Sequence, residues 1–356
     1  MHIMFLLPGH GKKPIGGHKI IYEYANYFVK EGHEVSIVYG SSCLFGKESF
    51  KNKIKSLARY IYFKTIGDFR PYGWFDLDRS IKLYFNWNLE ERRILKADKY
   101  ICTSIETAYY LNEFKCKNSD KIYFIQGYEN WKWGNDMVHE TWKFNMKKVT
   151  ISEWLMELIK KNNEIVYLVE NGFDFNVFDL DVPVESRQNT NVLMLYHTSP
   201  NKGVANGFKS LDLVKKEIPE LQVNLFGTFP KPVNLPTGYN YYRIPEKEKL
   251  RMLYNDAAIF VGTSIEEGWG LTVGEAMQCG CAIVCTDNKG YQAMAIDNST
   301  AKVSPAGDIK SMADNIIELI KNSETRYSIA QKGYEHIKKF DNAEAFSKFK
   351  KILNDD

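Results

Sequence analysis

Short apolar runs with the character of β-strands alternate with amphipathic helical runs along most of this sequence, and this alternation restricts the folds that it can adopt. The first 40 residues contain an apolar strand at residues 3–7, a glycine-containing loop, a helix at 20–30 and a second strand at 35–39. A strand, a helix and a further strand in so short a stretch form a βαβ unit, which requires a parallel sheet. The sequence therefore predicts an α/β fold with doubly wound sheets.

A second series of the same kind follows in the other half of the chain. Its predicted strands lie at residues 192–196, 223–226, 258–262 and 282–286, and its predicted helices at 207–217 and 247–254. Residues 179–190, between the two series, have poor apolar periodicity and include a proline, which is typical of a linker. Because 356 residues exceed one ordinary core, we predict two domains, at residues 1–180 and 181–335.

The bulk composition excludes several classes of protein. With 44% apolar and 26% charged residues the chain is not expected to be disordered, and a net charge of +3 is too small to indicate nucleic-acid binding. No apolar run reaches the length of about 18–20 residues that crosses a bilayer, and the N-terminus reads as a strand without a basic leader. The cysteines form no C-x-x-C pair and are expected to be buried free thiols in the cytoplasm, and they are Cys43, Cys102, Cys116, Cys279, Cys281 and Cys285.

Four glycines lie between the first strand and the first helix, at positions 9, 11, 16 and 17. A dinucleotide fingerprint fails at Pro14, and a P-loop fails because His18 follows the glycine pair instead of lysine and a hydroxyl residue. What remains is the Gly16-Gly17 pair, which allows a ligand to approach the backbone closely. A purely structural turn is the alternative interpretation.

Residues 266–280 read EEGWGLTVGEAMQCG and combine two glutamates with a glycine turn that opens a helix. Free amides at Gly270–Thr272, with the positive end of the helix dipole behind them, suit a diphosphate. Glu275 lies one turn into the helix, where it can accept hydrogen bonds from ribose hydroxyls, and Glu267 lies beside whatever group the diphosphate carries. Together these features predict a nucleotide-sugar site, although each glutamate taken alone is better explained as a solvated charge.

The same stretch resembles the E-x₇-E signature of retaining glycosyltransferase family 4, the glycosyl transferases group 1, with Trp269 where that family usually has phenylalanine. Further landmarks of the family are matched in order along the chain, at residues 1–40, 149–159, 169–178, 201–211 and 249–271. The resemblance implies a GT-B fold, in which two Rossmann-like domains face each other across a cleft and the second binds the donor. It also implies that the C-terminal helix, at residues 336–356, completes the first domain, and that no metal or other cofactor is needed.

Roles for individual residues follow from the resemblance. Lys202 would neutralise the diphosphate of the nucleotide-sugar donor, Glu267 would face the transferred sugar and Glu275 would bind the ribose. The remaining predicted donor-binding residues are Gly16, Gly17, Gly227, Gly268, Trp269, Gly270, Leu271 and Thr272. A fixed cation at Lys202 also makes physical sense, because charge builds on the departing phosphate.

The sequence departs from the family at two places. An arginine is expected about six residues before Lys202, but this region reads Tyr196-His197-Thr198, so His197 becomes a candidate catalytic group beside the alternative of a structural histidine. Gln126 stands where many members have histidine. The surrounding letters, YFIQGYEN, are similar to bacterial surface-polysaccharide rhamnosyltransferases. Glu129, Trp131 and Trp133 follow, and with Gln126 they are the predicted acceptor-binding residues, although core packing would explain the tryptophans equally well.

Two D-x-D strings, at residues 76–78 and 179–181, are interpreted as accidental, so no metal site is predicted.

Residues 50–64 form a predicted basic amphipathic helix with Phe50, Ile54, Leu57 and Ile61 on one face. Such a helix suits an anionic membrane surface, where a lipid-linked acceptor would lie, but ordinary packing on its own domain explains it equally well.

These observations predict a retaining, metal-independent glycosyltransferase of cell-surface polysaccharide synthesis. It would move a sugar from a nucleotide diphosphate sugar to a saccharide or lipid-linked saccharide acceptor. Two alternatives remain open: a nucleotide-sugar hydrolase or epimerase on the same fold, and a non-catalytic carbohydrate-binding subunit.

Overall fold

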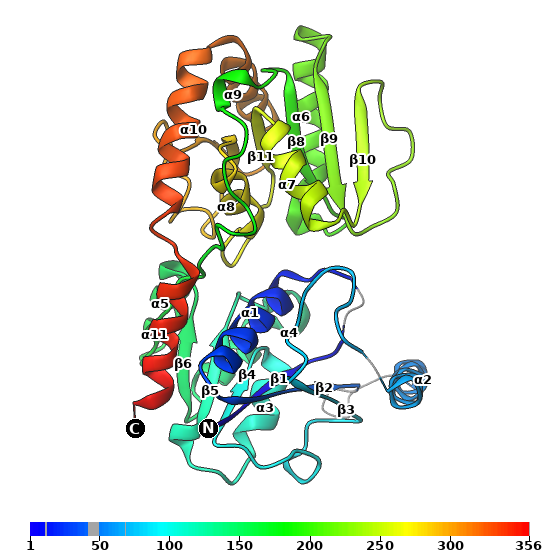
Figure 1. The fold of residues 1–356 in the computed structure, drawn as a ribbon, viewed down its shortest axis with the longest axis vertical. Coiled ribbons are helices and arrows are strands. Elements are labelled where there is room, and N and C mark those ends of the chain that lie inside the picture. Colours follow the sequence, from blue (N-terminus) through cyan, green and yellow to red (C-terminus); the bar gives the residue numbers. More distant parts are fainter. Residues whose placement is uncertain (11–12, 42–49, 68, 356) are drawn as a thin grey trace. The chain divides into compact units, whose positions relative to one another are not determined.

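A computed structural model describes residues 1–10, 13–41, 50–67 and 69–355 of the chain (Figure 1). Gly11 of the glycine loop and Cys43 lie outside these described residues. The chain divides into two compact units, one of Met1–Glu170 with Ala343–Asp356 and one of Asn171–Asn342. Each unit contains a single parallel sheet with helices connecting its strands.

The first unit is built on a seven-stranded sheet of order β3-β2-β1-β4-β5-β6-β7. Its strands are β1 His2–Leu7, β2 Glu34–Gly40, β3 Lys82–Asn86, β4 Lys99–Cys102, β5 Lys121–Ile125, β6 Lys147–Thr150 and β7 Tyr167–Leu168. Its helices are α1 Gly16–Lys30, α2 Phe50–Ile66, α3 Ile105–Asn112, α4 Asn130–Trp142, α5 Glu153–Lys160 and α11 Asn342–Asn354. The central strand β1 is apolar throughout its buried length because helices cover both faces of a parallel sheet.

The second unit is built on a six-stranded sheet of order β10-β9-β8-β11-β12-β13. Its strands are β8 Asn191–Tyr196, β9 Gln222–Gly227, β10 Tyr239–Arg243, β11 Ile259–Gly262, β12 Ala282–Asp287 and β13 Lys302–Pro305. Its helices are α6 Val204–Glu217, α7 Lys247–Asp256, α8 Leu271–Gln278, α9 Ile309–Lys321 and α10 Ser323–Ile337. The two parallel sheets with alternating helices confirm the predicted doubly wound α/β class.

Each sheet contains one point at which the strand order reverses. In the first unit β1 pairs with both β2 and β4, and in the second β8 pairs with both β9 and β11. The connections on the two sides of such a point leave in opposite directions, so a crevice opens at the carboxyl ends of these strands. Candidate sites are therefore expected after β1 and β4 and after β8 and β11.

The boundary between the units differs from the predicted one at residue 180, because it lies between Glu170 and Asn171. Residues 179–190 are firmly held in the second unit and do not link it to the first. The buried Arg187 guanidinium donates to the carbonyls of Val182 at 2.7 Å and Ala257 at 3.0 Å. The low periodicity of this stretch reflects a surface-following coil that is anchored by polar contacts.

The C-terminal helix predicted at residues 336–356 corresponds to α11, and its assignment to the first unit is confirmed, but it begins only at Asn342, after a break that follows α10. At the break the Phe340 carbonyl accepts a hydrogen bond from the Phe173 amide at 2.9 Å. Beyond it α11 packs in the first unit, where Phe349 lies 4.8 Å from the Tyr24 ring of α1 and 5.0 Å from the Phe124 ring of β5. A helical period alone runs through the break because both helices carry apolar faces.

Cys102, Cys116, Cys279, Cys281 and Cys285 are free thiols, and all but Cys116 are buried. Burial raises the pKa of each of the buried thiols above its ordinary value. None of the helices in the described part of the chain has the length and apolar character needed to cross a membrane.

Candidate functional site

The second unit brings Lys202 and Glu267 together at the carboxyl ends of β8 and β11. The Lys202 ammonium lies 2.5 Å from Glu267 Oε1, which also accepts a hydrogen bond from the Ser264 hydroxyl at 2.7 Å. Lys202 closes the short 3₁₀ turn Pro200–Lys202 after β8, and Glu267 lies in the loop between β11 and α8. The side chains are 27% and 16% exposed, so this ion pair is screened by water only in part.

Close backbone packing holds these two loops together. Gly203 has φ +60°, and a Cβ atom there would lie 2.0 Å from the Thr263 carbonyl oxygen. The Thr263 hydroxyl donates to the Lys202 carbonyl at 2.7 Å. On the other side of Glu267, a Cβ atom on Gly290 would lie 2.5 Å from the Glu267 carbonyl oxygen. Glycine is therefore required at both positions for the ion pair to form as it does.

Helix α8 begins beside this pair at Gly270, whose φ of +95° favours glycine. No side chain of the described residues caps this end of the helix, and its first turn contains no acidic residue. The amides of Leu271 and Thr272, in that first turn, therefore present partial positive charge beside the ion pair. Gly268 lies partly exposed in the loop just before the helix.

Trp269, a predicted donor-binding residue, has its indole in the core of the second unit. The side chain is 2% exposed and stands edge-on to the Phe340 ring at 5.3 Å. The indole therefore acts as an anchor for the glycine turn, and only the backbone of this residue is left to bind a ligand. An aromatic residue at this position, phenylalanine or tryptophan, fills the same apolar space.

Glu275 lies one turn into α8 and is buried, with 7% of its surface exposed. Its Oε2 accepts a hydrogen bond from the Tyr254 hydroxyl of α7 at 3.0 Å. Burial, with a further contribution from Glu275, raises the pKa of Tyr254 well above its usual range. The tyrosine therefore stays protonated and orients the carboxylate.

His197 follows β8 and is partly buried against the Phe229 ring, at 4.6 Å. Burial and then the positive charge of Lys202 lower its pKa, so the ring is neutral near pH 7. Its Nδ1 accepts a hydrogen bond from the Ser199 amide at 2.9 Å, which leaves the proton on Nε2. The Nε2–H of His197 can therefore donate a hydrogen bond to a ligand.

Gly227, another predicted donor-binding residue, ends β9. A Cβ atom there would lie 2.2 Å from the Tyr196 carbonyl oxygen, so the close packing of β9 against β8 requires glycine.

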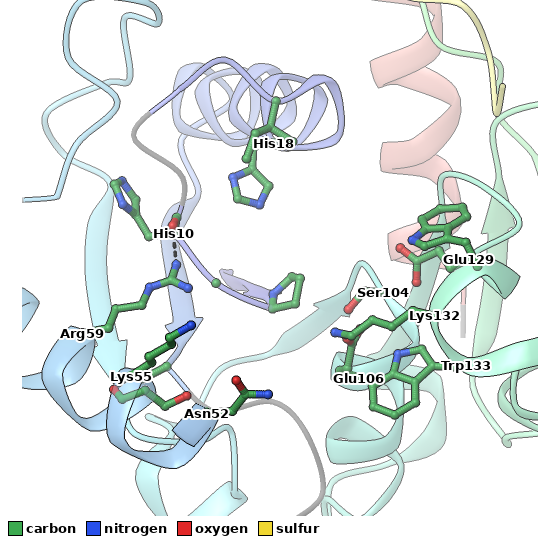
Figure 2. Close-up of a pocket in the computed structure, with 16 residues that line it drawn as sticks. His10, His18, Asn52, Lys55, Arg59, Ser104, Glu106, Glu129, Lys132 and Trp133 are labelled. Atoms are coloured by element: carbon green, nitrogen blue, oxygen red, sulfur yellow. Dashed lines mark hydrogen bonds and ion pairs between the residues drawn. The ribbon is translucent and has the colours of Figure 1, made fainter. Parts of the chain in front are cut away.

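The first unit contains a pocket of about 530 Å³ at its own reversal point (Figure 2). The residues that line it follow β1, β2, β4 and β5 or belong to α2. Of the predicted acceptor residues, Glu129, Trp131 and Trp133 line this pocket, whereas Gln126 does not. Gln126 instead donates to the Gly17 carbonyl at 3.3 Å. Gly16 and Gly17 are not lining residues, but their neighbours Ile15 and His18 are.

Glu129 begins the segment that leads into α4, and its Oε2 accepts a hydrogen bond from the Ile105 amide at the start of α3, at 2.9 Å. Burial raises the pKa of Glu129 to about 7, against the opposing effect of that hydrogen bond. Beside it, the buried Glu106 carboxylate forms an ion pair with Lys132. The two carboxyl groups form an acceptor-rich wall for hydroxyl donors.

Several pocket residues were not predicted from the sequence: His10, His18, Ser41, Asn52, Lys55, Ser56, Arg59, Ser104, Glu106 and Lys132. His18 directly follows the glycine pair, and Ser104 lies just after β4, so position after the end of a strand is the signal that points to them. The α2 residues had no such signal. Trp142, the last residue of α4, is fully buried in the core of the unit and does not line the pocket.

The two D-x-D strings occupy ordinary structural positions. Asp78 accepts hydrogen bonds from the amide and hydroxyl of Ser80 at 2.8 and 2.7 Å. Asp181 pairs with Arg251 at 2.6 Å.

Comparison with protein families matches residues 181–336 to the model of the glycosyl transferases group 1. This match covers most of the second unit. The match spans β8 to α10, and so it includes Lys202, Glu267 and Glu275 on the elements described above. The predicted family is therefore confirmed on the unit that carries the E-x₇-E stretch.

Two curated relatives are glycosyltransferases. The poly(glycerol-phosphate) alpha-glucosyltransferase of Bacillus subtilis (strain 168) is 24% identical over 178 residues, which are 45% of this chain and 25% of the relative. The phosphatidyl-myo-inositol mannosyltransferase of Mycobacterium leprae (strain TN) is 28% identical over 75 residues, 21% of this chain and 20% of the relative. The aligned parts thus span a quarter or less of these relatives' lengths.

Among solved structures, Anabaena Alr3699/HepE in complex with UDP and glucose superimposes with a TM-score of 0.73 at 13% identity. The likeness covers 99% of this chain and 99% of that one. At this identity the likeness shows the fold alone. Group 1 glycosyl transferases of this architecture are GT-B proteins, and the predicted GT-B class with two Rossmann-like domains is confirmed.

Proposed function

We propose that this chain is a retaining, metal-independent glycosyltransferase that moves a sugar from a nucleotide diphosphate sugar to a saccharide or lipid-linked saccharide. The observation that carries the proposal is the Lys202–Glu267 pair in front of the start of α8, which no side chain of the described residues caps. A cation and free helix amides bind a diphosphate, and a carboxylate beside them accepts hydrogen bonds from a sugar. Glu275, buried one turn further along, is assigned to the ribose hydroxyls.

In the proposed reaction the acceptor oxygen bonds to the anomeric carbon while the bond from that carbon to the phosphate oxygen breaks. Negative charge then grows on the diphosphate, where Lys202 and the α8 amides stabilise it. The acceptor proton passes to the departing phosphate, because attack occurs on the face from which the diphosphate leaves. The His197 Nε2–H is assigned a hydrogen bond to the same phosphates, in place of the arginine that the family usually has.

The comparisons support this proposal in chemical terms. The Anabaena structure contains UDP and glucose, and the two curated relatives are named for sugar transfer to a glycerol-phosphate polymer and to a phosphatidylinositol. For this chain we propose a role in cell-surface polysaccharide synthesis at the inner face of the membrane. A deoxysugar donor such as dTDP-rhamnose belongs in the first screen because of the YFIQGYEN segment.

Turnover of a nucleotide-sugar is the first test. UDP-, GDP- and dTDP-sugars are screened for binding by thermal shift and then for nucleotide release with and without saccharide acceptors. We expect release that depends on acceptor, product with the donor's anomeric configuration by NMR, and an unchanged rate in EDTA. Free sugar as the main product would indicate a hydrolase, an altered sugar an epimerase, and no turnover of any donor a binding subunit.

Helix α2 favours contact with a membrane surface. Its apolar residues Phe50, Ile54, Leu57 and Ile61 are 78%, 53%, 49% and 52% exposed, and Phe63 is its one buried residue. This exposure supports the membrane interpretation over ordinary packing of the apolar face against the first unit. Because the helix contains five basic and no acidic residues, we propose that it binds an anionic membrane surface.

Replacing Leu57 with serine is expected to weaken binding to vesicles that contain phosphatidylglycerol by about 30-fold, because a buried leucine contributes about 2 kcal/mol. Sedimentation with vesicles measures this affinity, with Val233→Ser as the control, since Val233 is 86% exposed in the second unit. Vesicles of phosphatidylcholine alone should bind the native protein weakly. Equal affinity of Leu57→Ser and Val233→Ser would contradict the proposal.

A further inference from the structure

The pocket of the first unit has two walls of different chemistry. On one side Lys55 and Arg59, one turn apart on α2, face the space, and on the other side lie Glu106, Lys132, Glu129 and Trp133 (Figure 2). His18, from the first turn of α1, points between the two walls. The walls therefore suit different parts of one ligand.

The first wall is suited to an anion. Lys55 has no ion-pair partner among the described residues. The α1 helix starts at this pocket with the apolar Ile15 at its N-cap, no capping side chain from the described residues and no acid in its first turn. His18 is 8% exposed, and its Nδ1 has no hydrogen-bond partner in the described part of the chain. A helix start, a lysine and an arginine around one space form a phosphate-binding arrangement.

The charge on His18 is consistent with this arrangement. Burial lowers its pKa to about 4, and the charges of His10 and Arg59 act in the same direction. The ring is therefore neutral near pH 7 and can donate a hydrogen bond to an anion without adding a positive charge. The Arg59 guanidinium itself donates to the His10 carbonyl and packs over Gly9, which fixes its place at the pocket.

The second wall is suited to hydroxyl groups. Glu106 is paired with Lys132, and the raised pKa of Glu129 leaves that group only partly charged near pH 7. This wall therefore repels an anion little, while its oxygens accept hydrogen bonds from hydroxyls. Trp131, 64% exposed at the rim, offers an indole face on which the C–H face of a sugar can stack. Trp133 lines the same wall, with the Lys132 ammonium over its ring at 5.0 Å from the centroid.

From these two walls we infer that the pocket binds an acceptor with a phosphate group next to its hydroxyls, in the class of glycosyl or polyol phosphates. The inference rests on the proposed function, and it names the acceptor of that transferase. A volume of about 530 Å³ suits a small-molecule ligand of this size. The phosphate can belong to a lipid-linked diphosphate or to a phosphodiester polymer, and the binding experiment separates these sources.

Calorimetry on the full chain measures the affinity of three probes: a farnesyl diphosphate-linked N-acetylglucosamine, a glycerol-phosphate oligomer and neutral octyl N-acetylglucosaminide. Lys55→Gln is expected to weaken binding of at least one phosphate probe about 10-fold, and to leave the neutral probe unchanged. Lys53→Gln removes the same charge from an exposed position that does not line the pocket, and it should change neither affinity.

Further outcomes test the inference and identify the source of the phosphate. Lys202→Ala must leave the phosphate-probe affinity unchanged, because a loss would place the probe in the second unit and overturn the inference. Equal affinities of Lys55→Gln and Lys53→Gln, or an equal loss for the neutral probe, would also overturn it. Selective loss for the farnesyl probe indicates the lipid source, and for the oligomer the polymer source. If the phosphate probes bind in a Lys55-dependent way but no sugar is transferred to them, the proposed function alone is refuted. If sugar is transferred to the neutral glycoside and the binding of the phosphate probes does not depend on Lys55, this inference alone is refuted.

Discussion

Replacing Lys202 with alanine is expected to lower kcat about 100-fold, with a smaller change in donor KM. The ammonium lies 2.5 Å from Glu267 in a partly buried position, where it can meet charge that develops on the departing diphosphate. Removal of one such preorganised group costs about 10²–10³ in kcat in other enzymes. Steady-state kinetics with the donor found by the screen measure the effect.

A matched control is Lys209→Ala, because Lys209 is exposed on the same stretch of chain, in α6. It should have wild-type kinetics. Lys202→Ala also leaves the Glu267 carboxylate without its cation, so the double variant Lys202→Ala, Glu267→Gln tests whether this exposed charge causes the loss. Recovery of kcat in the double variant would assign Lys202 a structural role and contradict its catalytic one.

The approach of Lys202 to Glu267 shows what the sequence could predict at the site. The two residues are 65 positions apart, and the expectation that they share a ligand came from the alternation of strands and helices and from family landmarks. Adjacent parallel strands bring their carboxyl ends together, so β8 and β11 had to place their following loops side by side. The direct ion pair depends on the φ of Gly203 and the packing of Thr263, which no periodicity encodes.

Trp269 illustrates the opposite case. A tryptophan between two glycines in a predicted binding loop was assigned to the ligand, but its indole fills apolar space against Phe340. Which side of a glycine turn a side chain takes depends on tertiary packing. The amino-acid sequence of the loop alone therefore does not determine the orientation of the tryptophan side chain.

The pocket of the first unit was predicted least well, and α2 gives the physical reason. Its pocket-lining residues include Asn52, Lys55 and Arg59, whereas its apolar stripe faces away from the unit. An amphipathic pattern predicts a helix with two unlike faces, and the usual assumption turns the apolar face inward. Here the apolar stripe is exposed, and the face turned toward the unit combines the buried Phe63 with the partly buried Ser56 and Arg59. The pattern therefore located the helix correctly and left its orientation undetermined.

Replacing Glu275 with alanine is expected to weaken donor binding about 10- to 100-fold and to raise the donor KM accordingly. A buried carboxylate that accepts hydrogen bonds from vicinal hydroxyls contributes about 1.5–3 kcal/mol, and Glu275 is 7% exposed and oriented by Tyr254. Calorimetry with the nucleotide diphosphate measures the loss without the need for turnover. Unchanged affinity would remove the ribose assignment.

The Tyr254 hydrogen bond makes a second variant necessary, because alanine at position 275 leaves the tyrosine hydroxyl buried without its acceptor, at a cost of about 1–3 kcal/mol in unfolding free energy. Tyr254→Phe removes the same hydrogen bond and keeps the carboxylate. If Glu275 binds ribose, Tyr254→Phe should retain most of the donor affinity while Glu275→Ala loses it, although thermal unfolding reports destabilisation in both. Equal loss of donor affinity in the two variants would instead mean that the carboxylate acts through the packing of α8 on α7, and the diphosphate at the α8 start would then be the main anchor of the donor.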